Sequence, residues 1–226
     1  GNGHSGERSP NGGEIRHLGI QEKSEAEGQA TLVATASWLD PSGKELMKET
    51  TTFHFISRGP TRIIDRKVTL TNTTDEPVVF KDTKEGMFGL RVARQLELPS
   101  KQEVTLTDAS GNPTTVRQLN DDGVTGNYRS SEGITGEEVW STRAKWMNLF
   151  GNIGSEKVSI IICDHPQNIS YPTWWHARGY GLFSANPLGA KDFTKGEQAL
   201  NFSLPADDSI TLRYRIIVAS GKDLSD

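Results

Sequence analysis

The chain has 226 residues, of which 34% are hydrophobic and 24% are charged, and its formal net charge is −4 at pH 7. This balance excludes a disordered chain, because there is enough apolar surface to form a core and little net charge to oppose it. The negative charge, without a cluster of lysine and arginine, excludes an electrostatic surface for nucleic acid. No apolar run approaches the roughly 18 residues of a transmembrane helix, so we expect no membrane partner.

The single cysteine, Cys163, excludes both an internal disulfide and a cysteine-based zinc site. It stands in the apolar run 158–163, which indicates a buried thiol rather than a nucleophile. We expect the glycine-rich residues 1–13 to form a flexible arm before a single domain at 14–226. Prior removal of a signal peptide is compatible with this start, and a periplasmic or secreted location is favoured over a cytoplasmic one.

Alternation of apolar and polar residues predicts β-strands along most of the chain. The hairpin signal is strongest at residues 31–56, where the turn Asp40-Pro41-Ser42-Gly43 joins two alternating runs. On the second run, Thr52 and His54 lie on the face opposite Phe53. His54 therefore faces either solvent or a ligand inside a concave sheet, and both interpretations remain open. In chain order, strands are expected at 12–20, 31–39, 44–56, 61–71, 77–80, 87–93, 138–150, 158–163, 198–204 and 210–219.

The last predicted strand, 210–219, has the clearest alternation, with Ile216 expected to point inward and Arg213 and Arg215 outward. The run 158–163 is apolar at both positions of the repeat, so we expect it to be central and covered on both faces. About ten strands, separated by turn signals and without a helix longer than one turn, predict an all-β fold in the form of a large antiparallel β-sandwich.

The segment 164–189, DHPQNISYPTWWHARGYGLFSANPLG, follows the buried run and is predicted to be a long loop stiffened by three prolines. It combines aromatic and ionisable side chains within a short stretch. Binding and catalytic residues often lie on loops that a rigid scaffold positions. We therefore expect the functional site on this loop.

Three parts of the sequence carry a resemblance to a known family. They are Asp82-Thr83-Lys84-Glu85-Gly86 with Phe88-Gly89-Leu90-Arg91-Val92-Ala93; Trp140 with Arg143-Ala144-Lys145-Trp146 and Gly151; and, in the loop, Asp164-His165-Pro166, Pro172-Thr173-Trp174-Trp175-His176-Ala177-Arg178, Tyr180-Gly181 and Ala185-Asn186-Pro187-Leu188-Gly189. In this order they resemble the bacterial family labelled "methane oxygenase PmoA", over roughly residues 30–220. The label does not describe this chain, whose sequence contains nothing like a copper monooxygenase.

The resemblance implies a supersandwich similar to that of galactose mutarotase and related carbohydrate-active proteins. Members of the family also carry paired histidines upstream of the part present in this sequence. We therefore expect the chain to be either the C-terminal part of a longer protein or a divergent member of the family.

A sugar-binding site needs aromatic faces for the C–H surface of the ring and planar polar groups for its hydroxyls. The predicted substrate-binding residues supply both kinds of group: Lys84, Arg91, Arg143, Lys145, Trp174, Trp175, Arg178, Tyr180 and Asn186. For acid–base chemistry, His176 or His165 is the candidate for one catalytic role, and Glu85 or Asp164 for the other. Each of these residues has a structural alternative, such as a place for the tryptophans in the core.

A divalent metal is an alternative, because His165, His176, Asp164 and Glu85 are suitable ligand types. The sequence has no short His-x-His or His-x3-His spacing, so no cofactor is predicted. Two functions remain open, namely acid–base chemistry on a sugar, of the epimerase or lyase type, and non-catalytic carbohydrate binding. In both cases the expected partner is a small carbohydrate or an oligosaccharide, while the oligomeric state is not predicted.

Overall fold

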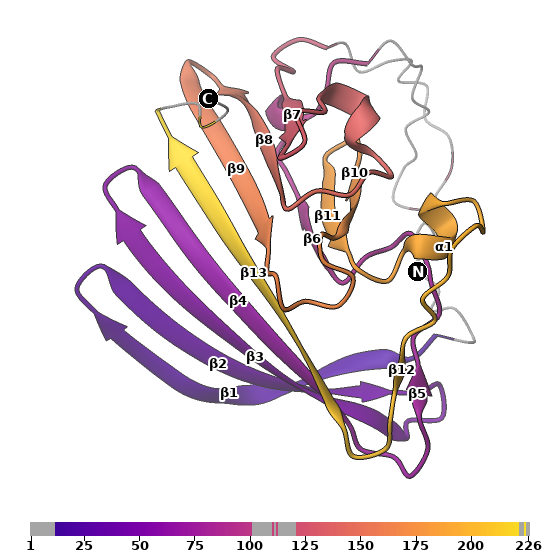
Figure 1. Ribbon diagram of the computed structural model, residues 1–226. Helices are drawn as coiled ribbons and strands as arrows, with labels where there is room; N and C mark the ends of the chain where they lie inside the picture. The colour runs from indigo at the N-terminus through magenta and orange to yellow at the C-terminus, as the bar shows by residue number, and fades with distance from the viewer. Residues whose placement is uncertain (1–11, 101–109, 111, 113–120, 222–223, 225–226) are drawn as a thin grey trace.

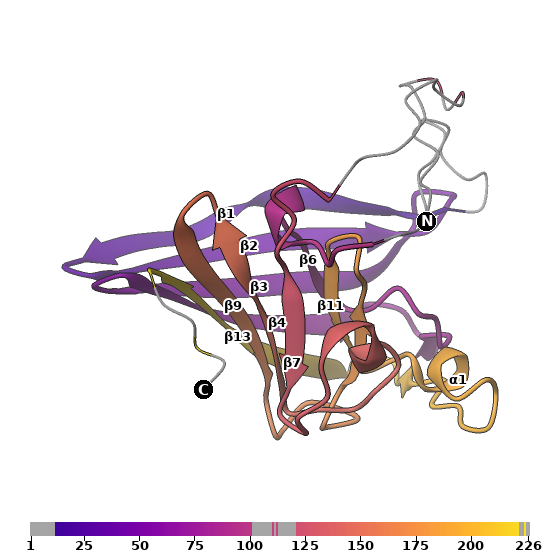
Figure 2. The same cartoon turned by 90° about the horizontal axis from the view of Figure 1, so that it is seen from above.

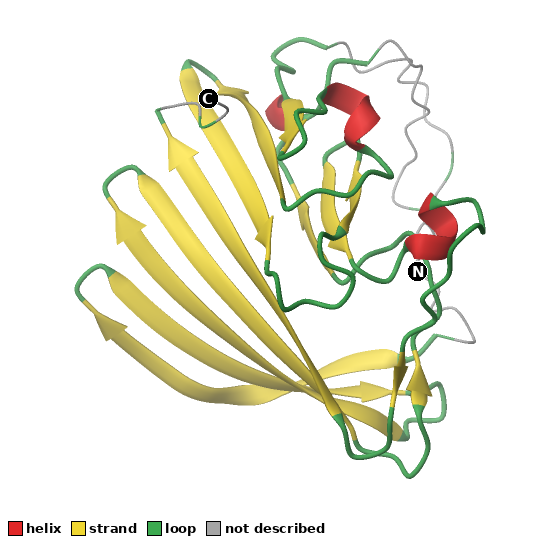
Figure 3. Ribbon diagram, in the orientation of Figure 1, coloured by secondary structure: helices red, strands yellow, loops and turns green. Residues whose placement is uncertain are grey.

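A computed structural model of the chain describes residues 12–100, 110, 112, 121–221 and 224 (Figure 1). The largest part of the fold is one eight-stranded antiparallel sheet, the large sheet (Figure 3). Across this sheet the strands are β1 (Glu14–Ala26), β2 (Gln29–Leu39), β3 (Glu45–Arg58), β4 (Thr61–Asn72), β13 (Ser209–Ser220), β9 (Glu156–Asp164), β8 (Trp146–Ile153) and β7 (Asn127–Ser130).

A second sheet, the small sheet, has three antiparallel strands in the order β10 (Trp174–Ala177), β11 (Leu182–Asn186) and β6 (Phe88–Arg91). It lies beside one face of the large sheet (Figure 2). Two short strands, β5 (Val78–Val79) and β12 (Ser203–Leu204), pair separately. The two main sheets confirm the predicted all-β fold and antiparallel sandwich.

The helices of the described residues are short: α1 (Ala190–Phe193) and the 3-10 helices η1 (Arg94–Leu96) and η2 (Gly136–Val139). None of them has the length and apolar character that crossing a membrane requires. The prediction that no helix exceeds about one turn is confirmed for this part of the chain.

The core lies between the small sheet and the face of the large sheet that it covers, which we call the inner face. From β13, Tyr214 stacks on Phe88 of the small sheet, with ring centroids 5.1 Å apart. Ile216 is also buried there, whereas Arg213 and Arg215 alternate with these residues and lie on the opposite, outer face. The inward and outward positions predicted for this strand are therefore confirmed.

The predicted long loop at 164–189 is wrong in part, because the segment contains β10 and β11. Trp175 and Ala177 of β10, with Phe183 and Ala185 of β11, form a buried apolar row that pairs across the two strands. The alternation that produces this row covers only four or five residues on each strand. Such short runs between prolines and glycines do not stand out in the sequence.

The strand predicted at 138–150 is also wrong in its first half. Residues 136–139 form η2, and Ser141 has a positive φ of 65°, which an extended strand excludes. Arg143 makes only an isolated β-bridge with Trp174, and the continuous strand β8 begins at Trp146. The strand predicted at 198–204 is similarly reduced to β12, and the one at 12–20 is longer than predicted, as β1.

The predicted flexible arm at 1–13 falls almost entirely outside the described residues, which begin at Gly12. The run predicted to be central, 158–163, is β9 and does lie inside the sheet, between β13 and β8. Ile162 is fully buried on its inner face, while Cys163 on the outer face is half-buried. Coverage of both faces is therefore only partial.

Asp82 connects the segment before the small sheet to the segment after it. Its carboxylate accepts backbone N–H hydrogen bonds from Lys191 (2.9 Å), Leu200 (2.9 Å) and Asn201 (2.8 Å). Burial by itself would raise the pKa of this carboxyl, but the three donors outweigh it, and the pKa lies below its ordinary value. Asp82 thus anchors helix α1 and the chain that follows it.

We predict that Asp82→Asn lowers the free energy of unfolding by about 2 kcal/mol at pH 7, because one charge-assisted acceptor is lost. Urea denaturation measures this change, and the exposed Asp75→Asn serves as the control that stays within about 0.5 kcal/mol. Because the folded pKa is depressed, the contribution is complete above about pH 4 and is lost as the pH falls through the folded pKa. Equal stabilities of Asp82→Asn and the wild type at pH 7 would contradict this role.

Candidate functional site

The structure separates the predicted catalytic residues into two places. His176 and Glu85 lie together on the side of the small sheet that faces away from the core, where they interact with Lys84 and Arg178. Asp164 and His165 lie at the end of β9, on the large sheet. The two places have different chemistry, and we describe each in turn.

Strand β10 builds the first place by its alternation. Trp175 and Ala177 point into the core, so Trp174 and His176 point to the other side of the small sheet. There they meet Phe193 of α1, with ring centroids 5.8 Å apart for Trp174 and 6.2 Å apart for His176. Helix α1, which Asp82 holds in place, therefore covers this part of the small sheet.

The segment from Lys84 to Gly86 approaches the same side of the small sheet very closely. Gly86 has φ of +76°, and a Cβ atom at this position would collide with the Oγ of Ser184 on β11. Only glycine satisfies both requirements. This close approach places the exposed Lys84 and Glu85 next to His176, the residue that pairs with Ser184.

His176 is only 3% exposed, and its Nδ1 atom has no hydrogen-bond partner among the described residues. Burial is the main reason why the pKa of the imidazole lies below its ordinary value. A hydrogen bond with the backbone of Lys84 opposes this effect, and the positive charge of Arg178 adds to it. The ring is therefore neutral at pH 7 and able to accept a proton.

Arg178, which interacts with His176, belongs to a surface that we call the arginine–aromatic cluster: Arg91, Trp140, Arg178 and Tyr180. The guanidinium of Arg178 lies 5.0 Å from the ring centroid of Trp140 and 5.6 Å from that of Tyr180, and Arg91 lies 5.4 Å from Tyr180. Trp140 is 36% exposed and Tyr180 is 51% exposed. Cation–π contacts therefore hold planar donors beside exposed aromatic surface.

The remaining predicted binding residues have contacts that support the fold. Arg143 donates to the carbonyls of Pro172 (2.9 Å) and Ser170 (3.0 Å) and lies over Trp174. The side chains of Trp175 and Asn186 are fully buried and expose no surface to a ligand. Their polar atoms bind the protein itself, since Trp175 Nε1 donates to Ala144 O and Asn186 Nδ2 to Thr83 O. Lys145 is exposed and contributes its backbone N–H to Ser131 Oγ.

At the second place, Asp164 has a structural role that the sequence did not reveal. Its carboxylate accepts hydrogen bonds from the backbone of His165 (3.0 Å) and Thr173 (2.9 Å) and from the side chain of Asn168 (2.7 Å). Burial is the main cause that raises the pKa of this carboxyl, and the three donors oppose it. Asn168 in turn exchanges two hydrogen bonds with the backbone of Arg213 on β13. Asp164 therefore fixes the loop after β9 to the large sheet.

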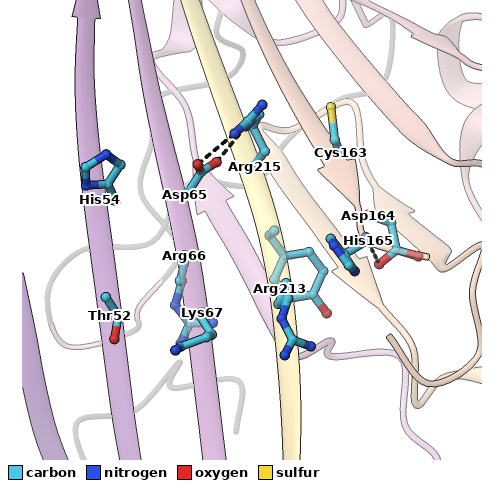
Figure 4. A pocket seen from close by; sticks show the side chains of 11 residues that line it. Thr52, His54, Asp65, Arg66, Lys67, Cys163, Asp164, His165, Arg213 and Arg215 are labelled. Carbon is cyan, nitrogen blue, oxygen red and sulfur yellow. Dashed lines mark hydrogen bonds and ion pairs between the residues drawn. The ribbon is translucent and has the colours of Figure 1, made fainter. Parts of the chain in front are cut away.

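A pocket of about 590 Å³ opens on the outer face of the large sheet, beside this loop (Figure 4). His54, Asp65 and Arg215 are paired across β3, β4 and β13, and Cys163 of β9 completes this row. The next row along the strands is Thr52, Lys67 and Arg213, which His165 extends. His54, for which two environments were open, thus lines a pocket.

The ion pair of Arg215 and Asp65 is the best-defined polar contact in the pocket. Arg215 donates from Nε (2.6 Å) and from a terminal nitrogen (2.8 Å) to the two carboxylate oxygens of Asp65. These hydrogen bonds are the main cause that lowers the pKa of Asp65 and raises the pKa of Arg215. Burial raises the pKa of the Cys163 thiol in the same row, which agrees with a thiol that is not a nucleophile.

The four suggested metal ligands do not gather at one point, because His176 of β10 is next to Glu85 of the turn before β6, while Asp164 and His165 lie at the end of β9. In the part of the chain that the structure describes, no three His, Cys, Asp or Glu side chains are grouped to hold a metal ion. Lys67 and Asp65, which line the pocket, were not predicted as site residues. Their role depends on the pairing of β4 with β13, which local sequence patterns do not specify.

These features define an all-β sandwich protein with a candidate site on each of its two sheets. The chain belongs to DUF6807, a family of unknown function, which matches residues 2–226. No curated protein matches the chain significantly.

Among solved structures, the chain is similar to the α-galactosidase from Lactobacillus brevis, with 14% sequence identity and a TM-score of 0.39. The similarity covers 92% of this chain and 25% of that enzyme, so the chain spans about a quarter of the enzyme's length. At this TM-score it carries no argument about function. The resemblance to the family labelled "methane oxygenase PmoA" stays a prediction.

We predict that His176→Gln makes the stability of the protein less dependent on pH between about 7 and 5. In the wild type the depressed pKa keeps the folded ring neutral, while the unfolded chain binds a proton below about pH 6.5. The unfolded state is then favoured as the pH falls, and the free energy of unfolding decreases. Urea denaturation of both proteins at pH 7 and pH 5 measures the difference, and an equal decrease in both would refute it.

Proposed function

We propose that this protein binds a carbohydrate on the outer side of its small sheet, at the arginine–aromatic cluster and the adjoining Lys84 and Glu85. The observation that carries the proposal is a convergence of separate segments. Lys84, Glu85 and Arg178 interact with His176, and Arg178 also contacts Trp140 and Tyr180, whose two aromatic rings are exposed.

The chemistry of these groups suits a sugar. An aromatic surface packs against the apolar C–H groups of a pyranose ring, and planar donors and acceptors satisfy its hydroxyls. The guanidinium of Arg178 lies over the rings of Trp140 and Tyr180 and makes no hydrogen bond with a described residue. Its N–H groups are therefore available for hydroxyl oxygens, while the exposed Glu85 supplies an acceptor.

The same place contains the groups for acid–base chemistry on the bound sugar. A neutral His176 accepts a proton, and Glu85 is the adjacent carboxyl that serves as the partner in proton transfer. Lys84 and Arg178 would stabilise negative charge that develops on the sugar. An epimerase-like or lyase-like reaction would use these roles.

A non-catalytic function at the same surface is the alternative, and one observation favours it. His176 is nearly buried, with 3% exposure, so the exposed members of the arginine–aromatic cluster are much easier for a sugar to contact. In that case the histidine only supports Lys84 and Phe193, and the protein binds carbohydrate without changing it.

We predict that a panel of mono- and oligosaccharides, including uronates and keto-sugars, contains a ligand that raises the Tm of the protein. Arg178→Gln and Tyr180→Ala should weaken that ligand's binding at least about tenfold, because each removes a group that contacts it. Arg58→Gln, an exposed arginine on the large sheet, is the matched control and should bind normally.

His176→Ala and Glu85→Gln then separate the two functions, when binding and turnover of the same sugar are both measured. Lost turnover with retained binding indicates an enzyme, whereas retained binding without turnover in any variant, the wild type included, indicates a binding protein. If no substitution in the cluster affects any sugar interaction, the proposal is wrong.

A further inference from the structure

The pocket on the outer face of the large sheet carries positive charge that no acidic side chain among the described residues neutralises. Two of its cations have acidic partners, since Arg215 pairs with Asp65, and Arg66 lies 3.8 Å from Glu49. The carboxylate of Asp164 binds N–H donors of its own loop. Two further cations line the same pocket.

These two cations are Lys67 of β4 and Arg213 of β13. They are directly opposite each other in the antiparallel register, where like charges repel. Neither makes an ion pair or a side-chain hydrogen bond with a described residue, and in Figure 4 their side chains lie next to each other in the pocket. Two adjacent cations of this kind form a site that an anion would stabilise.

The protein also fixes the position of one of these cations. Asn168 donates to the backbone carbonyl of Arg213 (2.7 Å) and accepts from its backbone N–H (2.8 Å), while Asp164 holds Asn168. The loop after β9 therefore attaches to the sheet at Arg213 itself. A site whose backbone is fixed in advance loses less entropy when it binds a ligand.

His165 adds a hydrogen-bond donor at the side of the pocket, and His54 adds a second polar ring nitrogen. The Nδ1 atom of His165 accepts from the backbone of Gln167 (3.1 Å), so its Nε2 carries the proton of the neutral ring. The Nδ1 atom of His54 interacts with Thr31 Oγ1 (3.1 Å), which leaves its Nε2 available. Thr52 contributes a hydroxyl to the same surface.

We propose that this pocket binds an oxyanion, a phosphate or carboxylate group carried by a small molecule, through Lys67, Arg213 and His165. The pocket volume of about 590 Å³ lies within the range of sites for small molecules and exceeds the size of an isolated oxyanion. The rest of the ligand occupies the row of His54, Asp65 and Arg215. This site is separate from the arginine–aromatic cluster and does not depend on the function proposed there.

The test is isothermal titration of the full chain at low ionic strength, with inorganic phosphate in one arm and glucuronate in the other. Glucose is the uncharged control for the glucuronate arm. The variants are Lys67→Gln and Arg213→Gln, and the matched control is Lys48→Gln, an exposed lysine of β3 outside the pocket. The titrations are repeated with Arg178→Gln, which alters the arginine–aromatic cluster only.

Either pocket variant should bind the anion at least about tenfold more weakly than the wild type, and Lys48→Gln should bind normally. Binding of phosphate alone identifies a phosphorylated ligand, and binding of glucuronate without glucose identifies a sugar acid. A cooperative melting transition of Lys67→Gln shows that this variant still folds, and a thermal shift with phosphate that the wild type has and this folded variant lacks supports the same site.

Three results would overturn the proposal. The first is that neither phosphate nor glucuronate binds to the wild type. The second is that Lys67→Gln and Arg213→Gln both retain the wild-type affinity. The third is that binding is lost in Arg178→Gln and kept in Arg213→Gln, which would place the anion at the arginine–aromatic cluster instead.

Discussion

The packing of β13 between β4 and β9 is the constraint on which both sheets of the protein depend. Because side chains of a strand alternate, β13 gives Tyr214 and Ile216 to the core and Arg213 and Arg215 to the opposite face. Tyr214 stacks on Phe88 and so holds the small sheet against the large one. A shift of the register by one residue would exchange the two sets and destroy both the core and the outer pocket.

Buried carboxylates organise the long connections around this sandwich. Asp82 binds three backbone N–H groups around α1, and Asp164 binds two backbone N–H groups and an amide in the loop after β9. Each connection brings side chains to a surface, since α1 covers His176 and the loop fixes Arg213. Asp82 and Asp164 thus position residues of the two candidate sites through the backbone that they hold.

The sequence allowed the fold class and most long strands to be predicted, because alternation over ten or more residues is a strong local signal. Strand β13 is the clearest case, with its inward Ile216 and outward Arg213. Strands β10 and β11 escaped prediction because they are short and lie between prolines and glycines. Their pairing depends on contacts such as that of Trp175 with Phe183, which no local pattern contains.

The sequence motifs identified some residues of the candidate site and missed those that only strand pairing brings together. Lys84 and Glu85 of one family motif and Arg178 of another all interact with His176, while the function of these residues stays a prediction. His165 and Asp164 do not join them, because β9 ends on the large sheet. Lys67 was missed, since only the pairing of β4 with β13 places it beside Arg213.

The strand order also bears on how the protein is made. Strands β1 to β4 pair with their neighbours in sequence and can form successive hairpins while synthesis continues. Strand β4 is flanked by β13, which is the last described strand to leave the ribosome. Until then β4 and β9 each present an open edge, which a chaperone could protect and another chain could capture. Completion of the sheet is therefore a late and non-local event, typical of slow-folding β proteins.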